Sequence, residues 1–415
     1  MRVLYAIPRY GAQFMGNETH GEVVNAIRQQ GIAMDVLSFT TRDGGGGPPG
    51  WGPGFGDEEV YRHLHSSTLA LKVASRLSSP LLHYDHVISM TTGLLAVTGQ
   101  RRYDILHIEG AYPLGAVAAL TQPIHQTPYI VTTTGGDLFT LPELNYGYGQ
   151  YPLPRRLISL ALRRAAWVRA NSTLSLRLAA EYGANEERAT VLPVSIGEAC
   201  YPPDTLPLSE FRATSRATLA AQYGWNSRPL VMCVGRLFHL KAQELLIEAL
   251  PALQQALGPV QLCIVGPDRD GYREFLEQTA QQAGVAESCT FTGAVPNTTI
   301  SQYLAAADVL AVPSRLEGLN RVVIEAAAVG TPSVVSDGAG AAELIATYGC
   351  GLIVPRNSAT ALAHAIERIL ASPSAWEQLH RSSQALAAQQ RASGVASALV
   401  TMYQRIGERP RGAAT

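Results

Sequence analysis

The chain lacks several features that would assign it to a specialised class of protein. None of its five cysteines has the C-x2-C spacing of a metal or redox motif. No apolar run reaches the length of a membrane-spanning helix, and the N-terminal run MRVLYAIPRYG is too short for a signal peptide. The formal net charge is −1, which gives no global electrostatic reason to bind nucleic acid. We therefore expect a cytoplasmic protein with reduced cysteines, no nucleic-acid partner and at most peripheral contact at the inner membrane face.

Lysine is also scarce. Only Lys72 and Lys241 occur among 32 lysines and arginines, so a lysine is not a routine surface choice in this sequence. Lys241 follows the apolar segment Leu230–Val234 and begins an apolar-periodic helix, with Gly235 and Arg236 just before it. An ammonium and a guanidinium five residues apart at a strand-to-helix turn are suited to neutralising a diphosphate.

Strand-like and helix-like segments alternate through most of the 415 residues, which is typical of α/β proteins with parallel sheets. In the first half the predicted strands are Val3–Ile7, Ala33–Phe39, Ile105–Ile108, Tyr129–Thr133, Trp167–Ala170 and Thr190–Leu192. In the second half they are Leu230–Val234, Gln261–Val265, Cys289–Thr292, Val309–Val312, Ser333–Ser336 and Gly351–Val354. This pattern predicts two Rossmann-like domains, residues 1–200 and 209–382, that join in the irregular stretch Ile196–Leu208. Ligands of such sheets bind at the carboxyl ends of the strands.

Residues 308–332, DVLAVPSRLEGLNRVVIEAAAVGTP, carry the most specific pattern. It predicts a buried strand, a loop that ends near Glu317, and a helix to about Val329 that Gly330 stops. Glu317 and Glu325 stand eight residues apart across the start of this helix. A helix N-terminus suits a phosphate, and the two carboxylates can accept hydrogen bonds from hydroxyls on either side of it. A diphosphate with a sugar at one end and a ribose at the other matches this layout.

Residues 43–59, DGGGGPPGWGPGFGDEE, form a low-complexity insertion in the first domain. Its glycine and proline content cannot support a helix or a central strand. Two interpretations stay open. The segment is a flexible surface loop, or it is a lid on the acceptor side in which Trp51 and Phe55 contact a sugar or a lipid.

The second half resembles the retaining glycosyltransferases of family 4, which have the GT-B fold. Their pattern is V-G-R-L, a nearby Lys, F-T-G-x-V, and P-S-x-x-E-G with a second Glu eight residues past the first. The matching segments are Val234-Gly235-Arg236-Leu237, Lys241, Phe291-Thr292-Gly293-Ala294-Val295, Pro313-Ser314-Arg315-Leu316-Glu317-Gly318 and Glu325. The resemblance is close over residues 228–370 and holds only in outline over the first half.

The resemblance implies an architecture and a division of labour. Two Rossmann-like domains would face each other with their parallel sheets across a cleft. Residues 1–200 would bind the acceptor, and residues 209–382 would bind the nucleotide sugar. A C-terminal helix, about Ser383–Ile406, would return residues 383–415 to the first domain.

The resemblance also implies roles for individual residues. The predicted catalytic residues are Arg236 and Lys241, which would bind the donor diphosphate, and Glu317, which would hold hydroxyls of the transferred sugar. The remaining donor-binding positions in the second half are Gly235, Gly318, Leu319, Asn320, Arg321 and, for the ribose diol, Glu325, and the first half adds Gly16 and Asn17. Asn320 replaces a usual Gly, but Asn tolerates a positive φ, so the backbone role is retained. Arg321 replaces a usual apolar residue and either contacts phosphate or lies on the surface.

The matches in the first half are weaker. Gly16 and Asn17 open a helix through about Gln30, where the family commonly has two glycines that meet the donor phosphate or the acceptor. The family often has the motif His-x-His at the end of one strand and a His before a Gly at the end of another. In this sequence each of these two motifs lacks one histidine. The acceptor-side candidates at these positions are His107, Glu109, Thr134 and Asp137. The substitutions indicate an unusual acceptor. His107 has the alternative of a buried, hydrogen-bonded histidine with a structural role.

These observations predict transfer of a hexose-type sugar from a nucleotide diphosphate, UDP favoured, to the hydroxyl of a sugar, lipid-linked or small-molecule acceptor. The resemblance implies retention, and we expect no metal or other cofactor. An epimerase or phosphorylase on the same frame, and a non-catalytic sugar-nucleotide-binding subunit, remain as alternatives. The pair Asp268 and Asp270 suits a divalent ion or a plain polar turn. The predicted basic helix Arg155–Trp167 also has two interpretations. Either it packs on the protein with its arginine face in solvent, or this face touches an anionic membrane.

Overall fold

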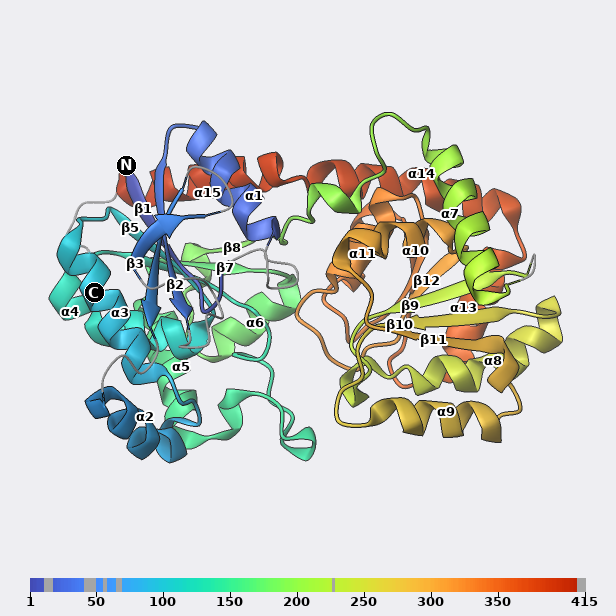
Figure 1. Ribbon diagram of the computed structural model, residues 1–415, viewed down its shortest axis with the longest axis horizontal. Coiled ribbons are helices and arrows are strands. Elements are labelled where there is room, and N and C mark those ends of the chain that lie inside the picture. The colour runs from blue at the N-terminus through green and yellow to red at the C-terminus, as the bar shows by residue number, and fades with distance from the viewer. Residues whose placement is uncertain (11–17, 41–49, 55–57, 65–68, 226–227, 409–415) are drawn as a thin grey trace. The chain divides into compact units, whose positions relative to one another are not determined.

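The computed structural model describes residues 1–10, 18–40, 50–54, 58–64, 69–225 and 228–408. Its contacts divide the chain into two compact units. The first unit comprises Met1–Ser195 with Ala392–Thr415, and the second comprises Ile196–Arg391. Each unit is built on a sheet of parallel strands with helices on both faces (Figure 1). This is the layered α/β architecture that the alternating sequence pattern predicts.

The sheet of the first unit has the strand order β3-β4-β2-β1-β5-β6-β7-β8. All neighbouring strands pair in parallel except β3, which runs antiparallel to β4 at one edge. The strands are β1 Arg2–Ala6, β2 Ala33–Thr40, β3 Gly50–Pro53, β4 Glu59–Leu64, β5 Ile105–Glu109, β6 Tyr129–Thr132, β7 Trp167–Ala170 and β8 Ala189–Val191. The central strands are buried because helices cover both faces of the sheet.

Two layers of helices enclose this sheet (Figure 1). The helices of the unit are α1 Glu18–Gln29, α2 Leu69–Leu82, α3 Val87–Gln100, α4 Ala116–His125, α5 Pro152–Arg164, α6 Thr173–Glu181 and α15 Ala392–Gly407. One face packs against α1 and α15, and the other packs against α3, α4 and α5. The expected single helix over about Ser383–Ile406 is wrong, because α14, Pro373–Gln389, stays in the second unit and only α15 joins the first.

The sheet of the second unit is parallel throughout, with the order β11-β10-β9-β12-β13-β14. Its strands are β9 Leu230–Val234, β10 Gln261–Val265, β11 Cys289–Gly293, β12 Val309–Val312, β13 Ser333–Ser336 and β14 Gly351–Val354. Its helices, besides α14, are α7 Leu208–Tyr223, α8 Glu244–Leu257, α9 Tyr272–Gln282, α10 Ile300–Ala306, α11 Arg321–Ala328, α12 Ala342–Tyr348 and α13 Ala359–Leu370. Helices α8, α9 and α13 cover one face, and α7, α10, α11, α12 and α14 cover the other.

Both sheets reverse their strand order beside the first strand of the unit. In the first unit the reversal lies between β1 and β5, and in the second it lies between β9 and β12. The loops that leave two such strands turn to opposite faces of the sheet, which opens a crevice at their carboxyl ends. The segments after β9 and β12 contain the predicted donor site.

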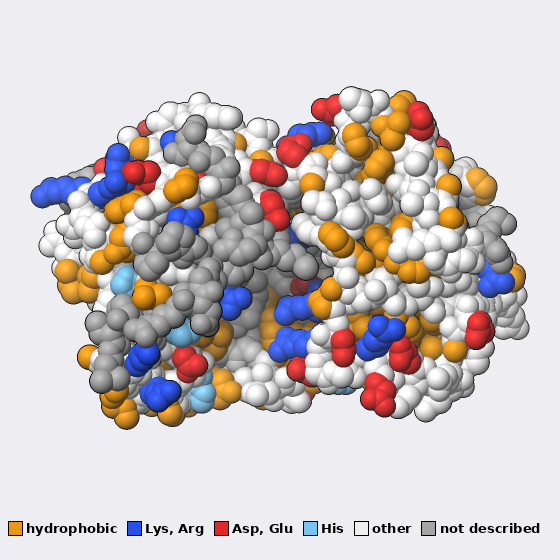
Figure 2. Space-filling view, viewed as in Figure 1, with side chains coloured by type: hydrophobic (Ala, Val, Ile, Leu, Met, Phe, Trp, Pro, Cys, Tyr) orange, Lys and Arg blue, Asp and Glu red, His pale blue; other side chains and the backbone are white. Residues whose placement is uncertain are grey.

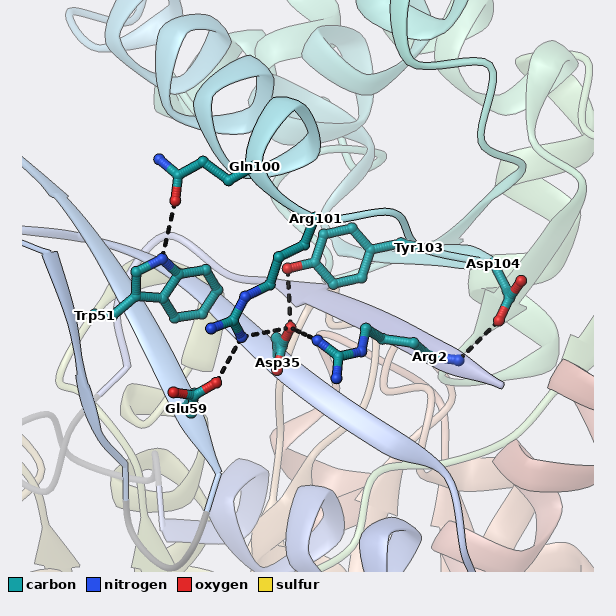
Figure 3. Close-up of polar contacts among 8 residues, drawn as sticks. All are labelled: Arg2, Asp35, Trp51, Glu59, Gln100, Arg101, Tyr103 and Asp104. Carbon is teal, nitrogen blue, oxygen red and sulfur yellow. Dashed lines mark hydrogen bonds and ion pairs between the residues drawn. The ribbon is translucent and has the colours of Figure 1, made fainter.

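A polar cluster at the amino ends of the strands fixes one edge of the first sheet (Figure 3). The buried carboxylate of Asp35 accepts hydrogen bonds from Tyr103 Oη at 2.9 Å, Arg101 Nη1 at 3.2 Å and Arg2 Nη1 at 3.4 Å. The Arg101 guanidinium also lies 3.8 Å from the centroid of the Trp51 ring. Trp51 Nε1 donates to Gln100 Oε1 at 3.0 Å. These contacts anchor β3 to the end of α3.

This anchoring corrects one expectation for the glycine-rich insertion. Trp51 is engaged at the amino ends of the strands, whereas ligands of such sheets bind at the carboxyl ends, so it is not an acceptor-side aromatic. The expected surface loop contains a strand as well, because β3 spans Gly50–Pro53. Phe55 and most of the insertion lie outside the described residues.

Candidate active site

The loop after β9 carries both predicted cations. Gly235 leaves the strand with a φ of 156°, and Arg236 follows it. Gln243 Nε2 donates to the Arg236 carbonyl at 2.9 Å, which ties this loop to the start of α8. Lys241 ends a short 3-10 turn, η6 His239–Lys241. The Arg236 side chain is exposed, and no carboxylate in the described part of the chain pairs with it.

A close backbone contact fixes the position of this loop. Gly266, just after β10, has a φ of 147°, and a Cβ at this position would lie 2.1 Å from the Gly235 carbonyl oxygen. Gly235 N in turn donates to the Val265 carbonyl at 2.9 Å. Any side chain at position 266 would displace the loop that carries Arg236, so glycine is required there.

Glu317 lies in the loop after β12 and pairs directly with Lys241. The distance from Lys241 Nζ to Glu317 Oε1 is 2.5 Å. Ser314 Oγ donates to Glu317 Oε2 at 3.1 Å, and Asn320 Nδ2 donates to the same oxygen. The backbone is held as well, because Glu317 N donates to the Gly338 carbonyl at 3.0 Å. The structure thus brings together two of the predicted catalytic residues, 76 positions apart in sequence.

Arg315 joins the two loops of the site. Its backbone N donates to the Leu240 carbonyl at 2.8 Å, and its Nη1 donates to the His239 carbonyl at 2.5 Å. Its Nη2 binds Glu244 Oε1 at 2.5 Å, and Tyr272 Oη donates to the other oxygen of that carboxylate. Sequence reasoning missed this brace, because Arg315 and Glu244 are 71 residues apart and neither belongs to a motif that signals the contact.

The N-terminus of α11 supplies unpaired backbone donors next to this pair. Within the described residues, the backbone N–H groups of Gly318, Leu319 and Asn320 donate to no protein acceptor. The helix then runs over Arg321–Ala328, and Gly330 follows with a φ of 72°, as the sequence predicts. The expected positive φ at Asn320 is wrong, because its φ is −93°. Asn320 therefore contributes to the site with its side chain, which donates a hydrogen bond to Glu317, and not with an unusual backbone conformation.

Glu325 lies in the second turn of α11 and is 7% exposed. Burial raises the pKa of its carboxyl above the ordinary value of 4.5, and the charge of Arg321 one turn earlier partly opposes this shift. None of the described residues donates a hydrogen bond to its side chain. A buried carboxylate without a protein donor is suited to accept hydrogen bonds from the hydroxyls of a ligand.

The structure favours the structural alternative for His107. The ring is 1% exposed, and both of its nitrogens have partners. Nδ1 lies 2.6 Å from Tyr403 Oη of α15, and Nε2 lies 2.7 Å from Thr132 Oγ1 of β6. Burial lowers the pKa of His107 well below 6.5 and keeps the ring neutral. His107 therefore ties β5 to α15 and β6, and it presents no free nitrogen to an acceptor.

The other acceptor-side candidates have different surroundings. Asp137 is buried and accepts hydrogen bonds from Ala111 N at 2.6 Å and Gly135 N at 2.8 Å, so it fixes the two loops after β5 and β6. Thr134 is exposed. Glu109 is buried, and burial raises the pKa of its carboxyl. Gly16 and Asn17, the donor-binding candidates of the first half, lie outside the described residues.

Glu109 belongs to a chain of polar groups that sequence reasoning missed. Tyr5 Oη donates to Glu109 Oε1 at 2.8 Å and lies 2.6 Å from His20 Nδ1 of α1. The buried Arg169 of β7 acts electrostatically on Glu109 and donates to the carbonyls of Leu192 and Pro193, both at 3.1 Å. Polar residues within three largely apolar strands, Tyr5, Glu109 and Arg169, were the available signal, but only the strand order brings them together.

The described residues contain no group of three or more His, Cys, Asp or Glu side chains arranged to hold a metal ion. Asp268 Oδ1 instead accepts a hydrogen bond from Arg273 N at 2.9 Å in the first turn of α9, and Asp270 pairs with Arg269 at 3.2 Å. This pair therefore forms a polar turn. No helix in the described part of the chain has both the length and the apolar character needed to cross a bilayer.

Two family models match the chain, one for each unit. The model described as "Glycosyl transferase 4-like domain" matches residues 17–195. The model described as "Glycosyl transferases group 1" matches residues 215–388. The second range contains the candidate donor-site residues of the second unit.

Curated relatives agree with these models. A GDP-mannose-dependent alpha-(1-6)-phosphatidylinositol monomannoside mannosyltransferase of Mycolicibacterium smegmatis is 36% identical over 166 residues, 38% of this chain and 43% of the relative. A 2-deoxystreptamine glucosyltransferase of Streptomyces kanamyceticus is 30% identical over 280 residues, 65% of this chain and 68% of the relative. The match to the mycobacterial relatives spans less than half of their length.

Solved structures show the same fold at low sequence identity. The sucrose-phosphate synthase of Thermosynechococcus elongatus has a TM-score of 0.77 at 19% identity, covering 98% of this chain and 99% of that one. HepE of Anabaena, in complex with UDP-glucose, has a TM-score of 0.69 at 21% identity, covering 98% of both chains. With two Rossmann-like units and a family model on each, the chain has the GT-B fold and belongs to family 4 of the glycosyltransferases.

Proposed function

We propose that the protein is an enzyme that transfers a hexosyl unit from a nucleotide-diphosphate sugar to an acceptor hydroxyl, with retention at the anomeric carbon. The observation that carries this proposal is the pairing of Lys241 with Glu317 at the N-terminus of α11. Arg236 lies exposed on the adjoining loop, and Glu325 is buried one turn into the helix. This site lies where the strand order of the second sheet reverses. It combines cations, unpaired N–H groups and two acids, and this combination matches the parts of a sugar nucleotide.

The reaction breaks the bond between the anomeric carbon and the diphosphate oxygen. Its dominant requirement is stabilisation of the negative charge on the leaving diphosphate as the sugar acquires oxocarbenium character. Arg236, Lys241 and the N–H groups at residues 318–320 meet this requirement without a metal. Glu317 orients the sugar hydroxyls, and Glu325 orients the ribose diol. The acceptor proton passes to the leaving phosphate oxygen on the same face, which accounts for retention without a protein nucleophile.

The proposal also extends to the nucleotide of the sugar donor. We favour UDP, which is common in the family, and HepE, with the same fold, was solved with UDP-glucose. The first curated relatives are named as GDP-mannose-dependent, which makes GDP the principal competitor. Glu325 binds the ribose that both nucleotides share, so it serves either donor.

The acceptor is proposed by class. The relatives named above act, by their names, on a phosphatidylinositol mannoside and on 2-deoxystreptamine. We propose a sugar, lipid-linked or small-molecule hydroxyl acceptor, in the biosynthesis of a glycan, glycolipid or glycosylated metabolite in the cytoplasm. Thr134 is the exposed acceptor-side candidate, and Glu109 lies buried at the same carboxyl edge of the first sheet.

A thermal-shift screen over UDP-, GDP- and ADP-sugars tests donor binding. The true donor raises the melting temperature by mass action, equivalent to about 2.7 kcal/mol at a hundred times its dissociation constant. The shift shrinks in Arg236→Ala and persists in Arg368→Ala, which removes an exposed arginine of α13 elsewhere in the same unit. If no sugar nucleotide raises the melting temperature of the wild-type protein, the proposal is wrong.

Product analysis then separates transfer from the alternatives. Incubation of the donor identified by the screen with candidate acceptors gives a new glycoside of unchanged anomeric configuration by NMR. Conversion of the donor without any acceptor identifies an epimerase, and dependence on inorganic phosphate identifies a phosphorylase. Tight donor binding with no product under all of these conditions identifies a non-catalytic subunit.

A further inference from the structure

Helix α2 presents a row of aliphatic side chains to solvent. Val73 is 48% exposed, Leu77 is 77% exposed and Leu81 is 64% exposed. Residues four apart lie on one face of a helix, so these three form a continuous stripe. Single exposed aliphatics are common on protein surfaces, but an aligned row of three is a feature of binding surfaces.

The charges on α2 and on the neighbouring α5 have one sign. The two helices contain six basic residues, Lys72, Arg76, Arg155, Arg156, Arg163 and Arg164, and no acidic residue. Within the described residues, none of these six side chains pairs with a carboxylate. Arg164 Nη1 donates to the Ala119 carbonyl at 3.3 Å. The whole chain has a net charge of −1, so this concentration of cations without a carboxylate partner is local.

A groove runs along the outer face of α5. It encloses about 490 Å³ and is lined by Pro152, Arg155, Arg156, Ser159, Leu160 and Arg163. The guanidinium of Arg155 lies 5.5 Å from the centroid of the Tyr182 ring. Three arginines around the rim of this largely apolar groove are suited to hold a phosphate group by charge-assisted hydrogen bonds.

The stripe and the groove belong to adjoining helices. Helices α2 and α5 contact each other. The ring of His83, just after α2, stacks on Tyr151, the residue before α5, with centroids 3.4 Å apart and planes at 9°. Figure 2 shows hydrophobic side chains together with Lys or Arg side chains at its lower left, where Figure 1 places α2. We call these exposed faces of α2 and α5 the docking surface.

We propose that the docking surface binds the surface of a bilayer that contains anionic phospholipids. The stripe of Val73, Leu77 and Leu81 enters the boundary between head groups and acyl chains, and the six cations pair with lipid phosphates. A protein partner fits less well, because the stripe has no aromatic anchor and no acidic residue lies on either helix. This inference is independent of the proposed transferase activity.

Vesicle flotation with the full chain tests the proposal. The protein is expected to float with vesicles of phosphatidylcholine mixed with phosphatidylglycerol, to stay behind with phosphatidylcholine alone, and to dissociate at high salt. The variant Leu77→Ser/Leu81→Ser is expected to lose flotation. Both side chains are exposed, so the melting temperature is expected to stay unchanged. The control Ile353→Ser changes an exposed aliphatic of the second unit and is expected to float normally.

A charge-matched pair of double variants tests the electrostatic part. Arg76→Ser/Arg156→Ser removes one exposed arginine from each helix and is expected to weaken binding to the anionic vesicles roughly 30-fold. Arg368→Ser/Arg381→Ser makes the same change in net charge on the second unit and is expected to bind as the wild type does. The proposal is wrong if the wild-type protein binds neither vesicle type, or if both double variants bind equally. It is also wrong if the leucine variant leaves flotation intact and instead dissociates a dimer.

Discussion

Lys241 is the side chain on which the proposed chemistry depends most. The variant Lys241→Ala is expected to reduce kcat at least about a hundredfold, because it removes a charge that stabilises the leaving diphosphate. The fold is expected to survive, since Lys241 is only partly buried and its ion-pair partner Glu317 is a partly exposed carboxylate. Steady-state transfer kinetics and a melting curve provide the two measurements.

Arg368→Ala is the matched control, because it removes one exposed positive charge from the same unit outside the site. It is expected to leave kcat unchanged. Near-normal transfer by Lys241→Ala would remove this residue from the mechanism. A collapse of its melting temperature would assign it a structural role instead.

Glu325 links ligand binding to pH. Burial raises the pKa of its carboxyl in the folded state, so the folded protein favours the protonated form. The protonated carboxyl contributes its full stability when the pH is below the ordinary pKa of 4.5. This contribution is lost as the pH rises through the higher pKa of the folded state. Glu325→Gln does not titrate. It is therefore expected to melt at a higher temperature than the wild type near neutral pH, and at the same temperature below 4.5.

The same variant is expected to bind the donor roughly tenfold to a hundredfold more weakly, because a hydrogen bond to a charged acceptor becomes one to a neutral acceptor. Melting curves across pH, with and without donor, measure both effects. Glu377→Gln, an exposed position on α14, serves as the control and is expected to change neither. A Glu325→Gln protein that is less stable at neutral pH would contradict the assigned role of burial.

Much of the donor site could be predicted from the sequence, because its residues lie in local motifs at strand ends. The pattern identified Lys241, Glu317 and the start of α11 from short spacings alone. The contacts of Arg315 with Glu244 could not be predicted, since they join segments brought together only by the order of β9 and β12. The same limit applies to the network of Tyr5 with Glu109.

The bond between His107 and Tyr403 ties α15 to the centre of the first sheet. Tyr403→Phe leaves a buried ring nitrogen without its partner, which is expected to cost about 1–3 kcal/mol of the free energy of unfolding. Turnover at a permissive temperature is expected to stay near the wild-type value, because His107 has no exposed nitrogen. Urea unfolding and transfer kinetics measure the two effects. A large loss of kcat with unchanged stability would restore His107 as an acceptor-side residue.

All twelve predicted strands are present, because each is a short apolar run bounded by turn residues. The strands β3 and β4, the last two at one side of the first sheet, were missed for compositional reasons. Gly50–Pro53 has the composition of a turn, and Glu59–Leu64 carries several polar residues because most of its side chains are only partly buried. The break between α14 and α15 at Gln390 and Arg391 was also missed, since no glycine or proline marks it.

The chain as a whole is expected to work without a divalent ion. Excess EDTA is expected to leave most of the transfer activity intact, because Arg236, Lys241 and the N-terminus of α11 supply the positive charge that a metal would otherwise provide. Initial rates before and after dialysis against the chelator measure this. Complete loss of activity that Mg²⁺ restores would contradict the scheme.

The return of α15 to the first unit has a consequence for biosynthesis on the ribosome. The nascent first unit emerges with one face of its sheet lacking the helix that packs over Val3 and Tyr5. The whole of Ile196–Arg391 must be translated before that helix exists, which takes on the order of 10–40 s at ordinary elongation rates. During this interval the uncovered apolar face is a target for chaperones, and a stop codon just before α15 would leave it uncovered permanently.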